Sequence, residues 1–322
     1  MTTLHEELLK VKDLVAGYEL PGAFIRAFDQ VSFEVKRGEV FGIVGESGCG
    51  KSTLAKSILR LLEPPGRIIA GSALFEDIDL IKAPIEIVNK YRWKKISYIP
   101  QTSMASLNPV MKIKDQFMEL IKKENKEISK DKAIEIINEQ LASVGLPTRV
   151  ADSYPHELSG GMKQRVIIAM ATLFKPSLII ADEPTTALDV VVQRGILQLL
   201  LHLKQKYGTS ILYISHDIAA VAQISDRVAV MYAGKIVEIG DVYDILKKPL
   251  HPYTEALLNS VPSLIENKEL RGLQGAPPDL KNPPSGCRFH PRCELKISGF
   301  CDKIEPSLTK IGNRYVACHL YR

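Results

Sequence analysis

A glycine-rich segment near the N-terminus has the spacing of a phosphate-binding loop. Residues 45–52 read GESGCGKS and fill every fixed position of the pattern G-x-x-x-x-G-K-[ST], between the apolar run VFGIV and a helix-forming stretch. Backbone N–H groups of such a loop turn towards phosphate oxygens, while Lys51 can reach the β- and γ-phosphates and Ser52 can bind Mg²⁺. The segment therefore predicts a nucleoside triphosphate site, in which Cys49 is interpreted as a tolerated small residue rather than a redox switch.

Two adjacent carboxylates follow another apolar run, LIIA at 178–181. This run is expected to be a buried central strand. Asp182 at its carboxyl end can hold Mg²⁺ through water, and Glu183 is then placed to polarise an attacking water molecule. Apolar runs that end in Asp-Glu are common by chance, so the assignment depends on the pairing with the phosphate-binding loop.

A second glycine turn, LSGGMKQR at 158–165, leads into a helix expected over 166–174. It offers another set of backbone N–H groups and another helix N-terminus to a phosphate. The simpler interpretation is a capped helix start, with glycine for flexibility. Because one nucleotide rarely needs two cradles, the pattern suggests that each cradle meets the nucleotide of a different copy.

The elements that must position these segments alternate between strand and helix, which indicates an α/β fold with a parallel sheet. A helix is expected from Gly50 to the prolines at 64 and 65, and a mostly helical block at about 102–172 forms an inserted subdomain. The expected strands, including a hairpin closed at 233–234, lie within 6–45 and at 96–100, 177–182, 210–214 and 226–240. A shift to proline-rich sequence near residue 248 predicts two domains, 1–248 and 249–322.

In this order and at these spacings, the motifs resemble those of the ABC-type ATPases, the nucleotide-binding subunits of transporters. Tyr18 matches the aromatic residue that stacks on adenine, and Gln101 matches the glutamine that senses Mg²⁺. Residues 186–189, TALD, match the segment that crosses the dimer interface, and His216 matches the histidine that contacts the γ-phosphate. The resemblance covers about residues 7–248.

The resemblance implies a P-loop NTPase core with an antiparallel β subdomain, in which two copies pack head to tail around two ATP molecules. It assigns catalytic roles to Glu183, His216, Lys51 and Gln101, and Mg²⁺ ligation to Ser52, Gln101 and Asp182. The implied ATP contacts are Tyr18, Gly45, Ser47, Gly48, Cys49, Gly50, Lys51, Ser52, Thr53, Gln101, Ser159, Gly160, Gly161, Asp182 and Asp189.

The C-terminal extension, residues 249–322, resembles that of the oligopeptide/dipeptide importer ATPases, a branch that includes nickel importers. The matching segments are HPYTEALLNSVPS at 251–263, GAPPDLKNPPSGCRFHPRC at 275–293 and VACH at 316–319. The resemblance implies a second ATPase subunit, either a related chain or a second copy, and two transmembrane permease subunits. It also implies an extracytoplasmic substrate-binding protein as an indirect partner.

Four cysteines in the extension have the spacing C-x5-C-x7-C-x16-C, at Cys287, Cys293, Cys301 and Cys318. Structural zinc usually shows paired C-x2–4-C spacing, which is missing here. Four thiolates can also hold a [4Fe–4S] cluster, which the resemblance implies for this branch. Zinc, with His290 or His319 as a substitute ligand, and reduced free cysteines are the alternatives.

Charge, motifs and hydropathy argue against three other classes: nucleic-acid-binding ATPases, nucleotide binders that do not hydrolyse ATP, and membrane-spanning chains. The net charge of the 322 residues is +5, and about +4 of it falls in 287–322, so the main body is a poor match for nucleic acid. This disfavours a soluble ABC-type ATPase acting in translation or DNA repair. The intact motif residues disfavour a regulatory nucleotide binder that does not hydrolyse ATP. No apolar run reaches the roughly 18–20 residues of a membrane span, so the chain is expected at the cytoplasmic face, held by its partners.

Overall fold

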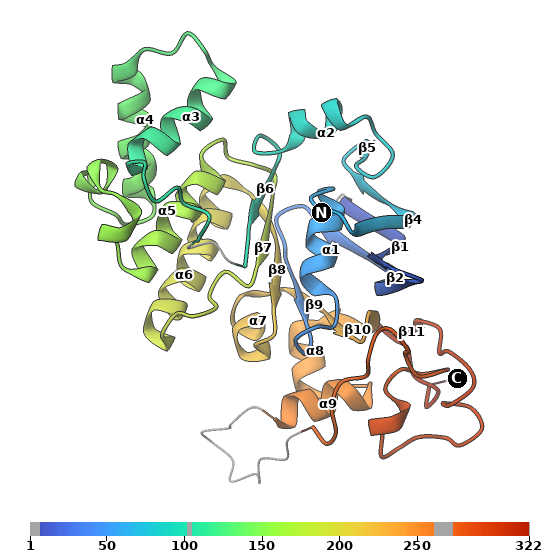
Figure 1. Cartoon of the computed structure of the whole chain (residues 1–322). Helices are drawn as coiled ribbons and strands as arrows, with labels where there is room; N and C mark the ends of the chain where they lie inside the picture. The colour runs from blue at the N-terminus through green and yellow to red at the C-terminus, as the bar shows by residue number, and fades with distance from the viewer. Residues whose placement is uncertain (1–6, 102–104, 261–272, 322) are drawn as a thin grey trace, which may run out of the picture. The chain divides into compact units, whose positions relative to one another are not determined.

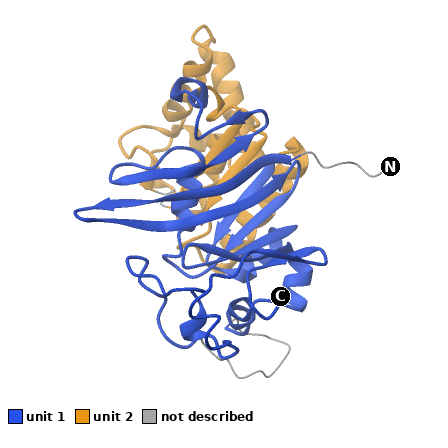
Figure 2. Cartoon of the chain, turned by 90° about the vertical axis from the view of Figure 1, so that its right-hand side faces the viewer, with its two compact units in different colours: residues 1–89, 210–322 blue, residues 90–209 orange. Residues whose placement is uncertain are grey.

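The computed structural model describes residues 7–101, 105–260 and 273–321, which form two compact units. Unit 1 comprises residues 1–89 and 210–322, and unit 2 comprises residues 90–209 (Figure 2). This division differs from the domains expected at 1–248 and 249–322, which remain a prediction. The first residues expected in the helical subdomain, 102–104, lie outside the described residues, as do 261–263 of the HPYTEALLNSVPS segment.

Unit 1 contains an antiparallel sheet in the order β2-β1-β4-β5 (Figure 1). Its bounds are β1 Glu7–Leu20, β2 Ala23–Lys36, β4 Gly66–Phe75 and β5 Ile78–Asp79. Apolar residues along β1 and β2, such as Leu9, Val11 and Phe33, are buried. Because apolar and polar residues alternate along much of these strands, one face of the sheet is covered and the other is more exposed. The predicted antiparallel β subdomain is therefore confirmed.

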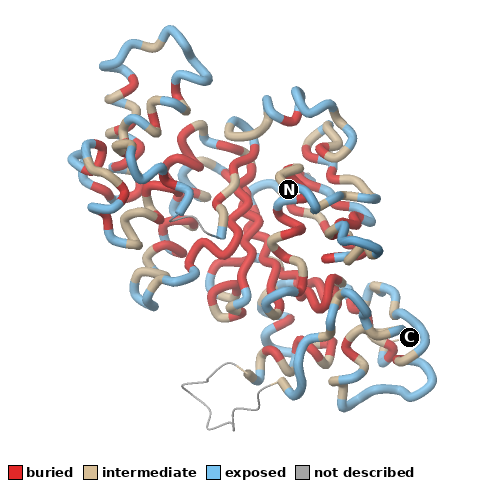
Figure 3. Tube along the Cα trace, in the orientation of Figure 1, coloured by how far each residue is buried: buried red, intermediate tan, exposed pale blue. Residues whose placement is uncertain are grey.

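The other strands of unit 1 form parallel pairs around β3, Val40–Val44, and antiparallel pairs beyond β9, Arg227–Tyr232. Strand β3 is buried along its whole length and pairs in parallel with β8, Ser210–Ser215, and with β9. Strand β8 is also wholly buried (Figure 3). Strand β10, Lys235–Asp241, returns antiparallel to β9, so the predicted hairpin closed at 233–234 is confirmed. The helices are α1 Lys51–Ile58, α7 Ile218–Ile224 and α8 Val242–Lys247. Helix α1 ends earlier than expected, well before the prolines.

Unit 2 contains two parallel strands and the helical block. Strands β6, Ile96–Ile99, and β7, Leu178–Asp182, pair side by side, as expected for buried apolar runs. The helices of this unit pack with apolar faces inward and are α3 Ile113–Glu124, α4 Lys130–Ser143, α5 Gly160–Thr172 and α6 Val190–Tyr207. The predicted α/β class with an inserted helical block is confirmed. Helix α2, Ile85–Tyr91, lies where the two units join in sequence.

The C-terminal extension is folded onto unit 1, although its sequence is rich in proline. Strand β12, Arg314–Val316, pairs with β10, and β11, Thr309–Ile311, pairs with β12, so the extension lengthens the sheet. Helix α9, Pro252–Asn259, buries Tyr253 completely. Neither these strands nor this helix is expected from the sequence. Within the part of the chain that is described, no helix has the length and apolar character of a membrane span.

Candidate nucleotide site

The predicted phosphate-binding loop connects β3 to α1 in unit 1. Gly48 and Gly50 have φ of 81° and 103°, a left-handed conformation that glycine adopts without strain. A Cβ on Gly50 would also lie 2.3 Å from the carbonyl oxygen of Ala27. Gly48 is therefore favoured by its backbone conformation, and Gly50 also by the close approach of neighbouring backbone. The loop leads into a helix N-terminus, as an anion site needs.

Lys51 lies across this loop rather than towards solvent. Its Nζ donates to the carbonyl oxygens of Gly45 and Glu46, at 2.6 and 3.0 Å, and the side chain is buried. Cys49 is also buried, which raises the pKa of its thiol. A protonated, covered thiol fits the interpretation of Cys49 as a small packing residue.

Other predicted nucleotide contacts of unit 1 gather around the loop. The Tyr18 hydroxyl on β1 lies 3.1 Å from Oγ1 of Thr53 on α1. His216 directly follows β8, whose last residue, Ser215, pairs with Val44 of β3. Because parallel strands end at the same edge of the sheet, His216 and the phosphate-binding loop leave β8 and β3 at the same level, and His216 is exposed there.

Unit 2 carries the two carboxylates at the end of β7. Asp182 is fully buried and accepts a hydrogen bond from the Tyr98 hydroxyl at 3.0 Å. Burial and then the charge of Asp182 raise the pKa of Tyr98, so Tyr98 remains a neutral donor. The hydrogen bond from Tyr98 thereby fixes the Asp182 side chain at the carboxyl end of its strand, the place predicted for Mg²⁺ ligation.

Glu183 is held by two donors on one oxygen. Gln101 Nε2 donates to Oε2 at 3.1 Å, and Thr186 Oγ1 donates to the same atom at 2.9 Å. The Glu183 backbone has a φ of 47°, a strained conformation for a side-chain-bearing residue, and such strain concentrates at functional sites. The structure thus brings Gln101 and Glu183 together. Sequence reasoning missed the role of Thr186 as a donor, although its position three residues after Glu183 was the available signal.

The second glycine turn is a capped helix start, one of the two interpretations that the sequence allowed, and its action on the nucleotide of another copy stays a prediction. Ser159 caps α5, accepting from the Met162 N–H at 3.3 Å, yet it is exposed in this unit. A Cβ on Gly161 would lie 2.7 Å from Cγ1 of Val192, so α6 packing requires this glycine. Asp189 caps α6 and accepts from the Val192 N–H at 2.9 Å.

Burial raises the thiol pKa of three cysteines of the extension, Cys287, Cys293 and Cys318. Burial, and to a smaller extent the charges of Cys301, Cys318 and Cys293, raise the pKa of Cys287 to about 11. The Cys287 N–H also donates to the Cys301 carbonyl at 2.8 Å. Nevertheless, among the described residues no group of three or more His, Cys, Asp or Glu is placed to hold a metal ion. All five cysteines are free thiols, and the predicted [4Fe–4S] cluster gains no support from this arrangement.

Two protein families match different parts of the chain, the nucleotide site and the C-terminal extension. The ABC transporter family matches residues 28–186, and the family described as "Oligopeptide/dipeptide transporter, C-terminal region" matches residues 237–301. The dipeptide transport ATP-binding protein DppD of Caldanaerobacter subterraneus is 43% identical over 98% of this chain and 97% of that protein. The oligopeptide transport ATP-binding protein OppD of Bacillus subtilis is 44% identical over 96% of this chain and 87% of that protein.

A solved structure with a similar fold is an ATP-binding cassette in a dimeric, post-hydrolysis state bound to ADP and Pi. It has a TM-score of 0.65 and 29% identity, and the match covers 73% of this chain and 98% of that structure. The uncovered quarter is comparable in size to the C-terminal extension. The chain is an ATPase that belongs to the ABC transporter family, in the branch with the oligopeptide/dipeptide C-terminal region.

Proposed function

We propose that this chain is the ATP-hydrolysing subunit of a binding-protein-dependent importer of dipeptides or oligopeptides. The observation that carries the proposal is the near full-length similarity to DppD and OppD proteins, which includes the C-terminal region as well as the ATPase core. Nickel is the alternative cargo. No comparison supports the rival role in translation or DNA repair.

In this proposal the chain works at the cytoplasmic face of a membrane with two permease subunits and a second ATPase subunit. An extracytoplasmic binding protein supplies cargo, and nucleic acid has no part. Lys51 and the loop N–H groups bind the phosphates of ATP, and Tyr18 stacks on the adenine. Ser52, Gln101 and Asp182 hold Mg²⁺, which offsets phosphate charge when bound.

Hydrolysis in the proposal depends on Glu183 and His216. The carboxylate of Glu183 orients and polarises the attacking water, while Gln101 and Thr186 keep that carboxylate in place. His216 donates to the γ-phosphate from the end of β8. Ser159, Gly160 and Gly161 close the site from the other subunit of the pair.

The cargo is tested with the complete transporter in lipid vesicles. Labelled dipeptide, pentapeptide and Ni²⁺ are offered with the binding protein outside and ATP inside. Uptake of either peptide that stops in a Lys51→Ala transporter supports the proposal, since the loop lysine is then needed for transport. Ni²⁺ uptake without peptide uptake would assign the chain to the nickel importers instead.

We propose further that the four cysteines of the extension bind one [4Fe–4S] cluster with a structural role. Its support is the presence of four cysteines in the extension, the number of thiolates that holds such a cluster. Protein purified without oxygen is expected to be brown and to contain about four irons per chain. A Cys301→Ser variant should lose the colour, whereas Cys49→Ser should keep it. Colourless protein with one zinc per chain would show that the metal is wrong.

A further inference from the structure

Glu46, the first variable residue of the phosphate-binding loop, faces the C-terminal extension with both its amide and its carboxylate. Its backbone N–H donates to the hydroxyl of Tyr253 on α9 at 3.0 Å. Its carboxylate accepts from both terminal nitrogens of Arg292, at 2.7 and 3.2 Å. The extension therefore contacts the loop itself, although these partners lie more than 200 residues away in sequence.

Arg292 is held rigidly in this contact. Its side chain is only 7% exposed, against 22% for Glu46, so the pair is shielded from solvent far more than a surface ion pair. The guanidinium lies 5.8 Å from the ring centre of Tyr232, and its Nε donates to the carbonyl of Gln274 at 2.8 Å. A two-pronged, partly buried pair of this kind is strong and specific in geometry.

An aromatic cluster supports the same contact from behind. The rings of Tyr232 and Tyr253 lie 4.5 Å apart, and each lies within 5.4 Å of the Phe289 ring. All three are almost completely buried. Tyr232 belongs to β9, Tyr253 to α9, and Phe289 lies between Cys287 and Cys293 of the extension. The cluster therefore joins the core to the extension. Tyr253 is fixed by this packing with its hydroxyl towards the loop.

We propose that Arg292 and Tyr253 are positioning residues for the phosphate-binding loop, through which the C-terminal extension sets the affinity for ATP. A carboxylate within this loop would repel the triphosphate. Arg292 neutralises Glu46 and draws it towards the extension, and Tyr253 engages the Glu46 N–H. The phosphates are then bound by the N–H groups of the loop glycines and by Lys51, without a nearby free carboxylate. ATP hydrolysis itself needs no chemistry from either residue.

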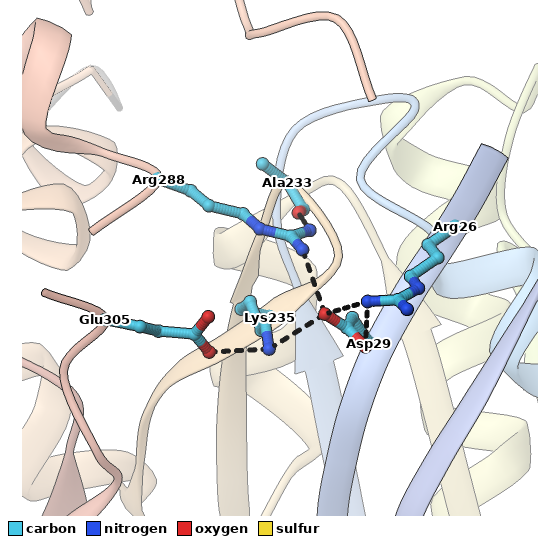
Figure 4. A network of polar contacts seen from close by, with 6 residues as sticks. All are labelled: Arg26, Asp29, Ala233, Lys235, Arg288 and Glu305. Atoms are coloured by element: carbon cyan, nitrogen blue, oxygen red, sulfur yellow. Dashed lines mark hydrogen bonds and ion pairs between the residues drawn. The ribbon is translucent and has the colours of Figure 1, made fainter. Parts of the chain in front are cut away.

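The extension has a second attachment that does not depend on Arg292 (Figure 4). Arg288 donates to the carbonyl of Ala233 and pairs with Asp29 at 3.2 Å. Lys235 bridges Asp29 and Glu305, at 3.2 and 2.6 Å. Since Asp29 belongs to β2 and Glu305 to the extension, this network and the strand β12 keep the extension in place when Arg292 is replaced.

The test measures MgATP binding to the full chain by calorimetry, with KM and kcat from the assembled transporter. Arg292→Ala is expected to raise Kd and KM about 3- to 10-fold, because an unneutralised carboxylate is left beside the phosphates, with kcat within about twofold. The double variant Arg292→Ala/Glu46→Gln should recover wild-type affinity to within about twofold, since the repelling charge is gone. The defect of Arg292→Ala should also shrink between about 0.05 and 0.5 M salt, because salt screens repulsion.

A control is Lys310→Ala, which removes an exposed cation of the extension on β11, away from the contacts with the loop. It should leave ATP affinity unchanged. If Arg292→Ala proves unstable, Glu46→Gln breaks the same pair from the other side and should bind MgATP at least as tightly as wild type. Equal weakening in Arg292→Ala and the double variant, or in Glu46→Gln, would overturn the proposal, as would an unchanged Kd in Arg292→Ala.

Discussion

Replacement of Glu183 by glutamine is expected to lower ATP turnover by at least about 100-fold while ATP still binds. The amide oxygen can accept from Gln101 and Thr186 as the carboxylate does, so the local structure should persist. Only the negative charge that polarises water is lost. The arrested protein should accumulate as an ATP-bound dimer, which size-exclusion chromatography detects, while phosphate release measures turnover.

The matched control is Glu135→Gln, the same chemical change at an exposed ion pair of α4. Its turnover should equal that of the wild type, because exposed pairs contribute little to stability and none of the ATP motifs is nearby in sequence. Thr186→Val should give an intermediate defect, because one of the two donors that orient Glu183 is removed. Hydrolysis near the wild-type rate in Glu183→Gln would remove Glu183 from the reaction.

The parts of the fold that the sequence predicts well are those with strong local patterns. Strands β3, β7 and β8 are short and mostly apolar, and each leads into residues of an ATP motif. Their type and order follow from hydrophobic pattern and from the rule that parallel strands alternate with helices. The end of α1 was less predictable, because its apolar pattern continues for a turn beyond Ile58.

The C-terminal extension was the least predictable part, since its order comes from contacts distant in sequence. The proline-rich sequence suggested only a domain boundary near residue 248, yet Phe289 and Tyr253 are buried against Tyr232 of the core. Strand β12 is three residues long and exists because it pairs with β10. Such pairing with a partner far away in sequence leaves no local pattern to recognise.

The same distinction applies to the candidate site. Motif spacing suggested Lys51, Asp182 and Glu183, because each motif lies within a few residues of sequence. It did not suggest Tyr98 as a donor to Asp182, or Arg292 as the partner of Glu46, because these pairs are 84 and 246 residues apart. Sequence therefore predicted the groups proposed to touch ATP better than the groups that hold them.

A mixed dimer is expected to regain activity that two separate variants lack. One copy carries Lys51→Ala, and the other carries Ser159→Asp. Aspartate is as good a helix cap as serine, so α5 should keep its start, where Ser159 accepts from the Met162 N–H. Its carboxylate, however, would repel a γ-phosphate that approaches from the other copy. Each variant alone should therefore fold, and each should lose nearly all ATP turnover.

The expected recovery of ATP turnover depends on whether each ATP site combines residues of both copies. If Ser159 acts on the nucleotide of the partner, one site of a mixed dimer holds both lesions and the other is intact. Random mixing of equal amounts makes half the dimers mixed, so about a quarter of wild-type turnover should return if each site works independently. If Ser159 acts on the nucleotide of its own copy, every site is damaged and no turnover returns. If hydrolysis requires both sites of the dimer to be intact, the mixed dimer also shows no turnover. In that case a mixed dimer that also carries Glu183→Gln should still retain one tightly bound ATP. Absence of both turnover and this single bound ATP would contradict action between copies, and the exposed glycine turn at Ser159 would then be a capped helix start alone.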